Sequence, residues 1–496
     1  MKKGVIVLIT LLMVIISLNG FGQVVFSQIG EAQYGENDYD SYGQSVSING
    51  DGNIIAAGAP YFRNIASRGG QVRIYEEMYG EWFQKGSDIL GALEEDALGW
   101  SVSLNDAGDI VAVGLPFNQE AGSSYGKVLV YHYVNDDWEQ LGDAIFGESA
   151  GDLAGTTVSL NADGYTLAVG AIEAVDSDIE EGTIRVYEYD NDHNTWVKFG
   201  SDMVGNTIGS NFGYSLDIND DGTIVASGAC TDNANGTNSG IVKIYEKSNN
   251  DWIQKGQTLN GNTDDQFGWR LSLNGNGSKI AVGSNRANND NGLVQVFTFN
   301  DGNWEQEGNS IEGDENNAGA SVSLNLEGNV MSIGFSSAVF QGEKAGMLKV
   351  FKLNSGNWEQ YGPELYGNND GGRYGSGTAL NDAGDIFVVA AEYDSELGPY
   401  RGKVETYQIE DPNGITTPEI NISLAPNPFT DCLKINSPKD IHNVIIYDFQ
   451  GRKVFENNYH GKKTITLSVP MLSPGIYFIN FDYNGQSLIS KKLIKL

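Results

Sequence analysis

GWSVSLNDAGDIVAVG, at residues 99–114, is the clearest copy of a segment that this chain carries seven times. Each copy has a Gly, then a Val-Ser-Leu-Asn-like run, then a second Gly three residues after the Asn, and most copies close on Ala-x-Gly. The spacing between copies stays between 51 and 58 residues, which indicates a repeat architecture. The shared Asn falls at Asn49, Asn105, Asn161, Asn219, Asn274, Asn325 and Asn381.

Each copy predicts four short β-strands. In the second copy these are Ser101–Asn105, Ile110–Gly114, Gly126–Tyr131 and Trp138–Gly142. The first two are joined by Asn105–Gly108, where Gly supplies the positive φ of a tight hairpin. Four antiparallel strands in a unit of about 40–50 residues are typical of a β-propeller blade.

The two ends of the repeat array complement each other. Six copies carry a fourth-strand Trp, but the seventh stops at Tyr407 and lacks that strand. The missing piece stands at the other end, because Phe26–Gly30 matches Trp82–Gly86 position for position. We therefore expect an all-β fold in which residues 23–410 form a seven-bladed β-propeller closed by the N-terminal strand.

Two features of the repeat are an aromatic-Gly pair, as in Phe212-Gly213 and Phe267-Gly268, and a later Gly-Ala-Pro, as in Gly58-Ala59-Pro60. Together they resemble the two halves of the FG-GAP repeat of integrin-α-type propellers. The resemblance implies the fold alone, because propellers host unrelated functions.

The N-terminus has the form of a secretory signal peptide. Met1-Lys2-Lys3 precedes an apolar run from Val5 to Leu18, and we assign residues 1–22 to the signal. The run is short for a bilayer span of about 20 residues, so we expect a mature protein that does not span a membrane.

The C-terminal part forms a separate region. A turn-rich linker at 411–421 precedes residues 422–496, where short strand-like runs alternate with turns and predict a small Ig-like β-sandwich. Its motifs are Pro426-Asn427-Pro428, then Tyr447–Arg452, then Leu472–Tyr477, then a basic-apolar end. In this order they resemble the type A C-terminal sorting domain of the type IX secretion system. The resemblance implies that residues 422–496 bind the outer-membrane secretion machinery, and that the protein is secreted or displayed on the cell surface.

Charge is distributed unevenly along the chain. The net charge is −35, yet from Asn421 onward nine Lys and Arg stand against five Asp and Glu. The remainder, leaving out Lys2 and Lys3, has 19 basic and 60 acidic residues. Because such an acidic surface repels phosphate backbones, we expect no nucleic-acid partner.

Large side chains follow the first Gly of three copies. Trp100, Tyr214 and Trp269, with Arg270 beside them, begin the strand nearest the expected centre of the propeller. Aromatic faces at a channel mouth stack on sugars or hold a peptide, so these four are the candidate ligand-binding residues. Packing between blades is the alternative.

One repeat hairpin carries a candidate calcium site, and calcium is the one cofactor for which the sequence offers ligands. The run 217–222 fits the D-x-[DN]-x-D-G pattern of calcium-binding integrin-type repeats, with Asp217, Asn219 and Asp221 as oxygen ligands. The other copies have Ser or Ala at the position of Asp217, and the alternative is a plain hairpin that keeps Asn and Gly for its backbone.

We find no arrangement of residues that singles out an active site. None of the four His begins an H-E-x-x-H motif, and carboxylates are too abundant for any pair to be distinguished. We expect a secreted or cell-surface binding or adhesion protein with a glycan or protein ligand, and no enzymatic activity. The alternatives are a carbohydrate-active hydrolase or lyase at the channel mouth, and a structural surface component.

Overall fold

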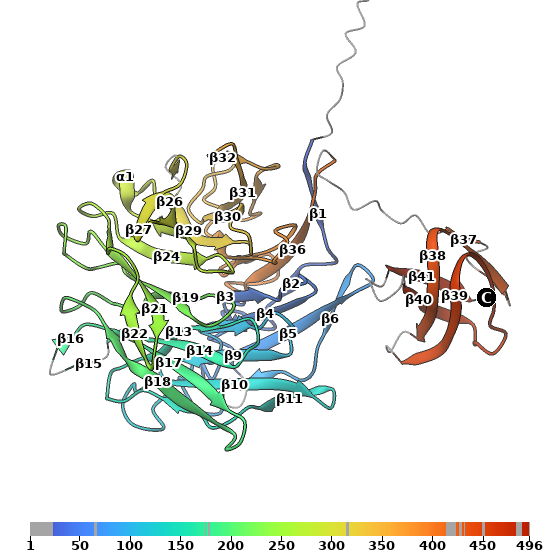
Figure 1. Cartoon of the computed structure of the whole chain (residues 1–496), viewed down its shortest axis with the longest axis horizontal. Helices are drawn as coiled ribbons and strands as arrows, with labels where there is room; N and C mark the ends of the chain where they lie inside the picture. The colour runs from blue at the N-terminus through green and yellow to red at the C-terminus, as the bar shows by residue number, and fades with distance from the viewer. Residues whose placement is uncertain are drawn as a thin grey trace, which may run out of the picture.

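The computed structural model of the chain describes residues 23–63, 67–173, 175–176, 179–313, 317–412, 423–425, 429–430, 432–448, 452–482 and 489–495. The expected signal peptide at 1–22 and residues 413–421 of the expected linker lie outside this part. The all-β class is confirmed: apart from the four-residue helix α1 (Ala287–Asp290), the described elements are strands. Figure 1 shows them as two groups, a large repeat region and a smaller C-terminal sheet.

The repeat region contains seven antiparallel sheets, of which six take four strands in chain order from one copy and the seventh takes its fourth strand from the N-terminus. The first strands are β3 (Ser45–Ile48), β8 (Ser101–Leu104), β13 (Ala154–Leu160), β19 (Ser215–Ile218), β24 (Phe267–Leu273), β29 (Ala318–Leu324) and β34 (Tyr374–Leu380). The second strands are β4 (Ile54–Ala59), β9 (Ile110–Leu115), β14 (Thr166–Ala171), β20 (Ile224–Ala229), β25 (Lys279–Ser284), β30 (Val330–Phe335) and β35 (Ile386–Ala391).

The outer half of each sheet is built the same way. The third strands are β5 (Gln71–Met78), β10 (Lys127–Val134), β17 (Thr183–Asp190), β21 (Ile241–Ser248), β26 (Leu293–Asn300), β31 (Met347–Asn354) and β36 (Lys403–Glu410). The fourth strands are β6 (Glu81–Gln84), β11 (Asp137–Gln140), β18 (Thr195–Val204), β22 (Asp251–Gln254), β27 (Asn303–Gln306), β32 (Asn357–Gln360) and, for the last sheet, β1 (Val25–Gln28). Two-residue strands extend six sheets by pairing with the third strand: β2 (Gln33–Tyr34), β7 (Ile89–Leu90), β12 (Ile145–Phe146), β23 (Leu259–Asn260), β28 (Ile311–Glu312) and β33 (Leu365–Tyr366). A two-stranded hairpin of β15 (Val175–Asp176) and β16 (Ile179–Glu180) stands apart.

The repeated Asn closes the hairpin between the first two strands. Asn105 Oδ1 accepts hydrogen bonds from the N–H groups of Asp109 (3.0 Å) and Ile110 (2.9 Å). Gly108 has a φ of 67°, the left-handed region that favours Gly. The Asn and Gly of each copy are therefore required by the backbone.

A ring of backbone hydrogen bonds joins the seven hairpins. The residue after each repeated Asn donates its N–H to the carbonyl of the equivalent residue in the next copy, at 3.0–3.2 Å. The last donor, Asp382, donates to the first residue, Gly50, so the cycle closes. Its members are Gly50, Asp106, Ala162, Asp220, Gly275, Leu326 and Asp382.

The N-terminal strand completes the last sheet, as the sequence predicts. β1 pairs with β36 in antiparallel register, with Phe26 opposite Ile409, and Figure 1 shows the two strands side by side. The indole N–H of Trp82 donates to the Ile29 carbonyl (3.0 Å), as that of Trp138 does to Lys85 (2.6 Å). The segment around β1 thus accepts the same Trp hydrogen bond from the first sheet that the segment after β6 accepts from the second sheet.

The fourth-strand Trp residues are core residues in all six copies, each at most 9% exposed. Each packs over the Gly that stands four residues after the equivalent aromatic residue of the preceding sheet. A Cβ added at Gly86 would lie 2.7 Å from the Trp138 ring, and one added at Gly362 would lie 2.5 Å from the ring of Phe26. Phe26 therefore occupies, in the seventh sheet, the position that Trp occupies in the other six.

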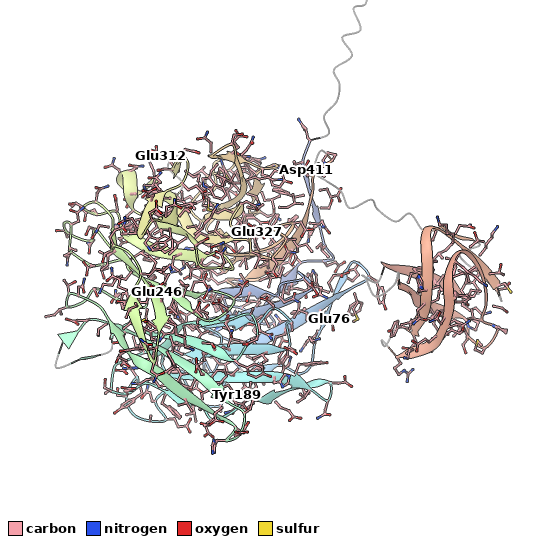
Figure 2. All side chains as sticks on the ribbon, viewed as in Figure 1. Glu76, Tyr189, Glu246, Glu312, Glu327 and Asp411 are labelled. Carbon is pink, nitrogen blue, oxygen red and sulfur yellow. The ribbon has the colours of Figure 1, made fainter. Side chains whose placement is uncertain are left out.

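Lys side chains connect neighbouring sheets on the outer side. Lys85 Nζ lies 3.1 Å from Glu76 Oε2 and 4.4 Å from the centre of the Tyr133 ring in the next sheet. Lys255 forms the equivalent ion pair, with its Nζ 2.8 Å from Glu246 Oε2. Figure 2 labels both carboxylates. Several of the few basic residues of this acidic region thus hold adjacent sheets together.

The C-terminal region is one sheet with its own core. Its strands are β37 (Ser423–Ala425), β38 (Cys432–Asp448), β39 (Lys453–Ser468), β40 (Gly475–Asp482) and β41 (Ile489–Lys495), with β38 paired to β37, β39 and β40. Register shifts interrupt the pairing of β38 and β39. Fourteen buried apolar side chains, from Phe429 to Leu493, form the core.

Described residues of two motifs and of the basic end make defined contacts, whereas the motif at 426–428 lies outside the described residues. In the Tyr447–Arg452 segment, Arg452 pairs with the Asp448 carboxylate at 2.8 Å. Tyr477 donates its hydroxyl hydrogen to the Ser473 carbonyl (2.9 Å). Lys495 is buried and lies over the Phe429 ring, so this terminal Lys is not merely a solvated charge.

Candidate functional site

The first strands are clamped to each other at the centre of the repeat region. Ser101 Oγ donates to the carbonyl of Gly155 in the next sheet (2.9 Å), and Ser45 and Ser215 do the same with Gly99 (2.8 Å) and Gly268 (2.7 Å). Each clamp involves the Gly that directly precedes a first-strand residue such as Trp100. The rigid inner strands therefore fix the position of that residue.

A cavity of about 290 Å³ lies between these strands, and all seven sheets contribute to its wall. Three of the four candidate residues line it: Trp100, Tyr214 and Arg270. The rest of its wall includes polar residues, among them Gln44, Thr156, Ser321 and Ser376, and apolar first-strand residues such as Val46, Val102 and Leu216.

Tyr214, Trp269 and Arg270 form one contiguous cluster. The Tyr214 and Trp269 rings lie 4.8 Å apart, and the Arg270 guanidinium lies 5.3 Å from the first ring and 5.4 Å from the second. Arg270 also donates to the carbonyl of Trp269 (2.9 Å). Trp269 thus supports the two side chains that reach the cavity rather than lining it.

Trp100 belongs to a second aromatic cluster. Its ring meets Phe117 edge-on at 5.1 Å and Tyr61 at 6.4 Å. Phe117 also lines the cavity. Neither Tyr61 nor Phe117 was a predicted site residue; the signal available was their position directly after Pro60 and Pro116 in the repeated Gly-x-Pro segment.

The only Cys of the repeat region is not available as a nucleophile. Cys230 is 1% exposed, and burial raises the pKa of its thiol to about 11. It therefore stays protonated at neutral pH, the unreactive form.

The candidate calcium ligands make contacts that explain their positions without an ion. Asp217 Oδ2 accepts from the N–H of Leu273 in the next sheet (2.8 Å), and Oδ1 accepts from Ser159 Oγ (2.9 Å). In the second copy Ser103 Oγ makes the equivalent contact with the N–H of Leu160 (2.9 Å). Asp217 thus fills the role that Ser has in its neighbours.

The rest of that hairpin is also engaged. Asn219 Oδ1 accepts from the N–H of Ile224 (2.7 Å), and Asp221 Oδ1 accepts from Asn219 Nδ2 (2.8 Å) and from the Thr223 N–H (3.1 Å). Within the described ranges, no group of three or more His, Cys, Asp and Glu is placed to hold a metal ion. Calcium at Asp217, Asn219 and Asp221 stays a prediction.

Replacing Asp217 with Ser should change how stability depends on pH. Burial raises the pKa of the Asp217 carboxyl to about 6 from its ordinary 3.8, so the folded protein binds this proton more tightly than the unfolded chain. Protonation of Asp217 therefore stabilises the fold; this stabilisation is complete below about pH 4 and is lost as the pH rises through about 6. We expect the free energy of unfolding of Asp217→Ser, relative to that of wild type, to be higher at pH 8 than at pH 4 by ~1–3 kcal/mol. Urea unfolding at the two pH values measures this difference. Equal stability differences at both pH values would contradict it, and Asp217→Ala, which lacks the acceptor for Leu273, is the control.

Three carboxylates gather on the ring of backbone hydrogen bonds. Burial, together with repulsion from Asp382, raises the pKa values of Asp106 and Asp220 to about 6. Burial and Asp51 raise that of Asp382. The ring of backbone hydrogen bonds therefore carries an acidic cluster, whereas no Asp or Glu is among the described residues of the cavity wall around Trp100.

Two segments have the G-x-S-x-G spacing of hydrolase nucleophiles, at 122–126 and 147–151. That motif acts on a strand-to-helix turn, but 122–126 lies in the connection between strands β9 and β10, and 147–151 in the connection between β12 and β13, where Ser149 donates to Asp152. Asp152 is buried and bound by Arg185 at 3.0 Å. This segment is therefore a structural connection.

The comparisons identify the C-terminal region. Residues 423–496 match the family model of the secretion system C-terminal sorting domain, which confirms the type IX sorting domain that the motifs indicate. Export by type IX secretion, contact with its machinery, and a secreted or cell-surface location follow from this domain. No FG-GAP or integrin-like family model matches the chain. The comparison with curated proteins gives no match. Among the described residues, no helix is long and apolar enough to cross a bilayer.

Proposed function

We propose that residues 23–410 form a seven-bladed β-propeller and that this propeller is the binding part of a secreted or cell-surface protein. The closed ring of seven backbone hydrogen bonds supports the propeller, as does the pairing of β1 with β36. Residues 411–421 then form the linker, and 422–496 form the sorting domain; the register shifts between β38 and β39 support a bend of its one sheet around the core, as a small Ig-like sandwich. The likeness to FG-GAP propellers belongs to the same proposal.

The central cavity is the observation that carries the binding function. Trp100 and Tyr214 present aromatic surface, and Arg270 adds hydrogen-bond donors, on strands fixed by the Ser–Gly clamps. Aromatic and polar groups held on rigid elements are typical of a ligand site. A glycan or a protein segment is the ligand class that such a surface suits.

The cavity wall favours binding over hydrolysis. Among the residues that the structure describes there, none is Asp, Glu or His. A glycosidase uses two carboxylates about 5–10 Å apart across the scissile bond. Turnover of a polysaccharide by the mature protein would support the hydrolase or lyase instead.

Truncating the cavity aromatics should weaken binding. We expect Trp100→Ala and Tyr214→Ala each to raise the Kd of a glycan ligand at least tenfold, because buried aromatic anchors dominate such sites. A glycan array with residues 23–496 identifies the ligand, and titration of the variants measures the loss. Phe83→Ala, at a 43% exposed aromatic residue on β6, is the matched control. Absence of any saturable ligand would favour a structural surface component.

A further inference from the structure

A second cavity, of about 650 Å³, lies where connections of the first and last copies meet. Four Tyr and three Arg side chains line this Tyr–Arg pocket: Tyr39, Tyr61, Tyr393, Tyr400, Arg63, Arg68 and Arg373. The loops after β4 and β35 supply five of them. Its size is within the range of ligand sites, about 300–1,000 Å³.

Two Arg residues in the pocket are held in the same way. The Arg68 guanidinium lies 4.7 Å from the Tyr61 ring and pairs with Glu95 at 2.9 Å. Arg373 lies 4.7 Å from Tyr393 and pairs with Glu392 at 2.9 Å. Since each guanidinium is fixed by a ring and a carboxylate, little side-chain entropy remains to be lost when a ligand binds.

The remaining Tyr residues extend the aromatic surface. The Tyr400 ring lies 5.2 Å from Tyr393 and 5.8 Å from Tyr39. Both Tyr39 and Tyr400 are about half exposed. At the other wall, Tyr61 meets Trp100, so the pocket adjoins the central cavity.

The charge of the pocket is opposite to that of the region around it. Residues 23–420 contain eight Arg, and three of them line this one pocket, while no Asp or Glu among the described residues does. Glu95 and Glu392 offset Arg68 and Arg373. Arg63 is exposed, and no ion pair involves it within the described part of the chain. The pocket therefore carries one cation available for an anionic group.

We propose that the Tyr–Arg pocket binds an acidic saccharide, a short glycan segment that carries carboxylate or sulfate groups. Tyr faces stack on sugar rings, the paired Arg residues donate to hydroxyl groups, and Arg63 binds the anionic substituent. This proposal rests on the proposed binding function and adds a second site, distinct from the central cavity.

Titration of residues 23–496 with three probes tests it: a galacturonate hexamer, a sulfated galactan oligosaccharide and a neutral β-1,4-glucan hexamer. We expect one or both acidic probes to bind and the glucan to bind at least tenfold more weakly. Binding of the acidic probe should weaken as NaCl is raised from 50 to 500 mM, because exposed charges are screened. The two acidic arms tell carboxylate from sulfate. Equal binding of the glucan, or of a polyglutamate peptide, would overturn the proposal.

Variants locate the site. Arg63→Gln and Tyr400→Ala should each raise the Kd of the acidic probe at least tenfold, and Arg63→Lys should retain most of the affinity. Arg286→Gln makes the same charge change at an exposed Arg elsewhere and should have no effect. Melting curves verify that each variant is folded. If Trp100→Ala abolishes binding while Arg63→Gln and Tyr400→Ala do not affect it, the proposed function stands and the second site is refuted.

Discussion

Phe26→Ala is expected to lower the free energy of unfolding of the repeat region by ~2–4 kcal/mol. The Phe26 ring packs edge-on against Phe387 at 5.1 Å and covers Gly362. Its removal leaves a void where the first strand of the chain joins the last sheet. Because β1 is held by only four residue pairs, the loss also frees an edge of β36. Urea or thermal unfolding of residues 23–496 measures the change.

Two variants separate this effect from a general one. Phe26→Trp installs the residue that the other six copies use at this position, and should keep most of the stability. Val25→Ala changes the neighbouring, 45% exposed side chain and should cost less than 1 kcal/mol. Equal stability of Phe26→Ala and Val25→Ala would contradict the packing role of Phe26 in the last sheet.

Deleting residues 423–496 is expected to abolish export. The sorting domain is the part of the chain that the secretion machinery recognises, so the truncated protein should accumulate in the periplasm. Fractionation with an antibody against the repeat region measures where the protein lies. Because the seven sheets pair without strands from the tail, the retained protein should still unfold cooperatively.

A point variant sharpens this prediction. Lys495 packs over Phe429 and links the last strand to the start of the domain. Lys495→Ala should reduce export, whereas Lys453→Ala, at an exposed Lys paired with Glu456, should not. Normal export of the chain without 423–496 would show that another segment carries the signal.

The strand pattern could be predicted from the sequence because it depends on local rules. Alternating side chains, the Asn–Gly hairpin and the fourth-strand Trp recur in each copy, so every copy supports the same interpretation. The pairing of Phe26 with the last sheet was also accessible, since one copy lacks a strand and an unmatched strand stands at the other end.

The contacts of individual sites could not be predicted in the same way. Asp217 matches a calcium pattern in its own hairpin, but its carboxylate faces Leu273 and Ser159, which belong to neighbouring sheets. The Tyr–Arg pocket draws on segments more than 300 residues apart, such as Tyr61 and Tyr400. A sequence pattern does not show which loops meet in space.

The pairing of the two ends of the repeat region also determines when the molecule can be complete. Ser27 and Glu410 bond to each other across 383 positions of the chain. During synthesis Val25–Gln28 is made before all seven copies and finds its partner only after the seventh has been made. Contacts this distant in sequence form slowly. Until β36 (Lys403–Glu410) has been made, β1 has no strand to pair with, and a chain interrupted before it leaves β1 as an unpaired edge strand.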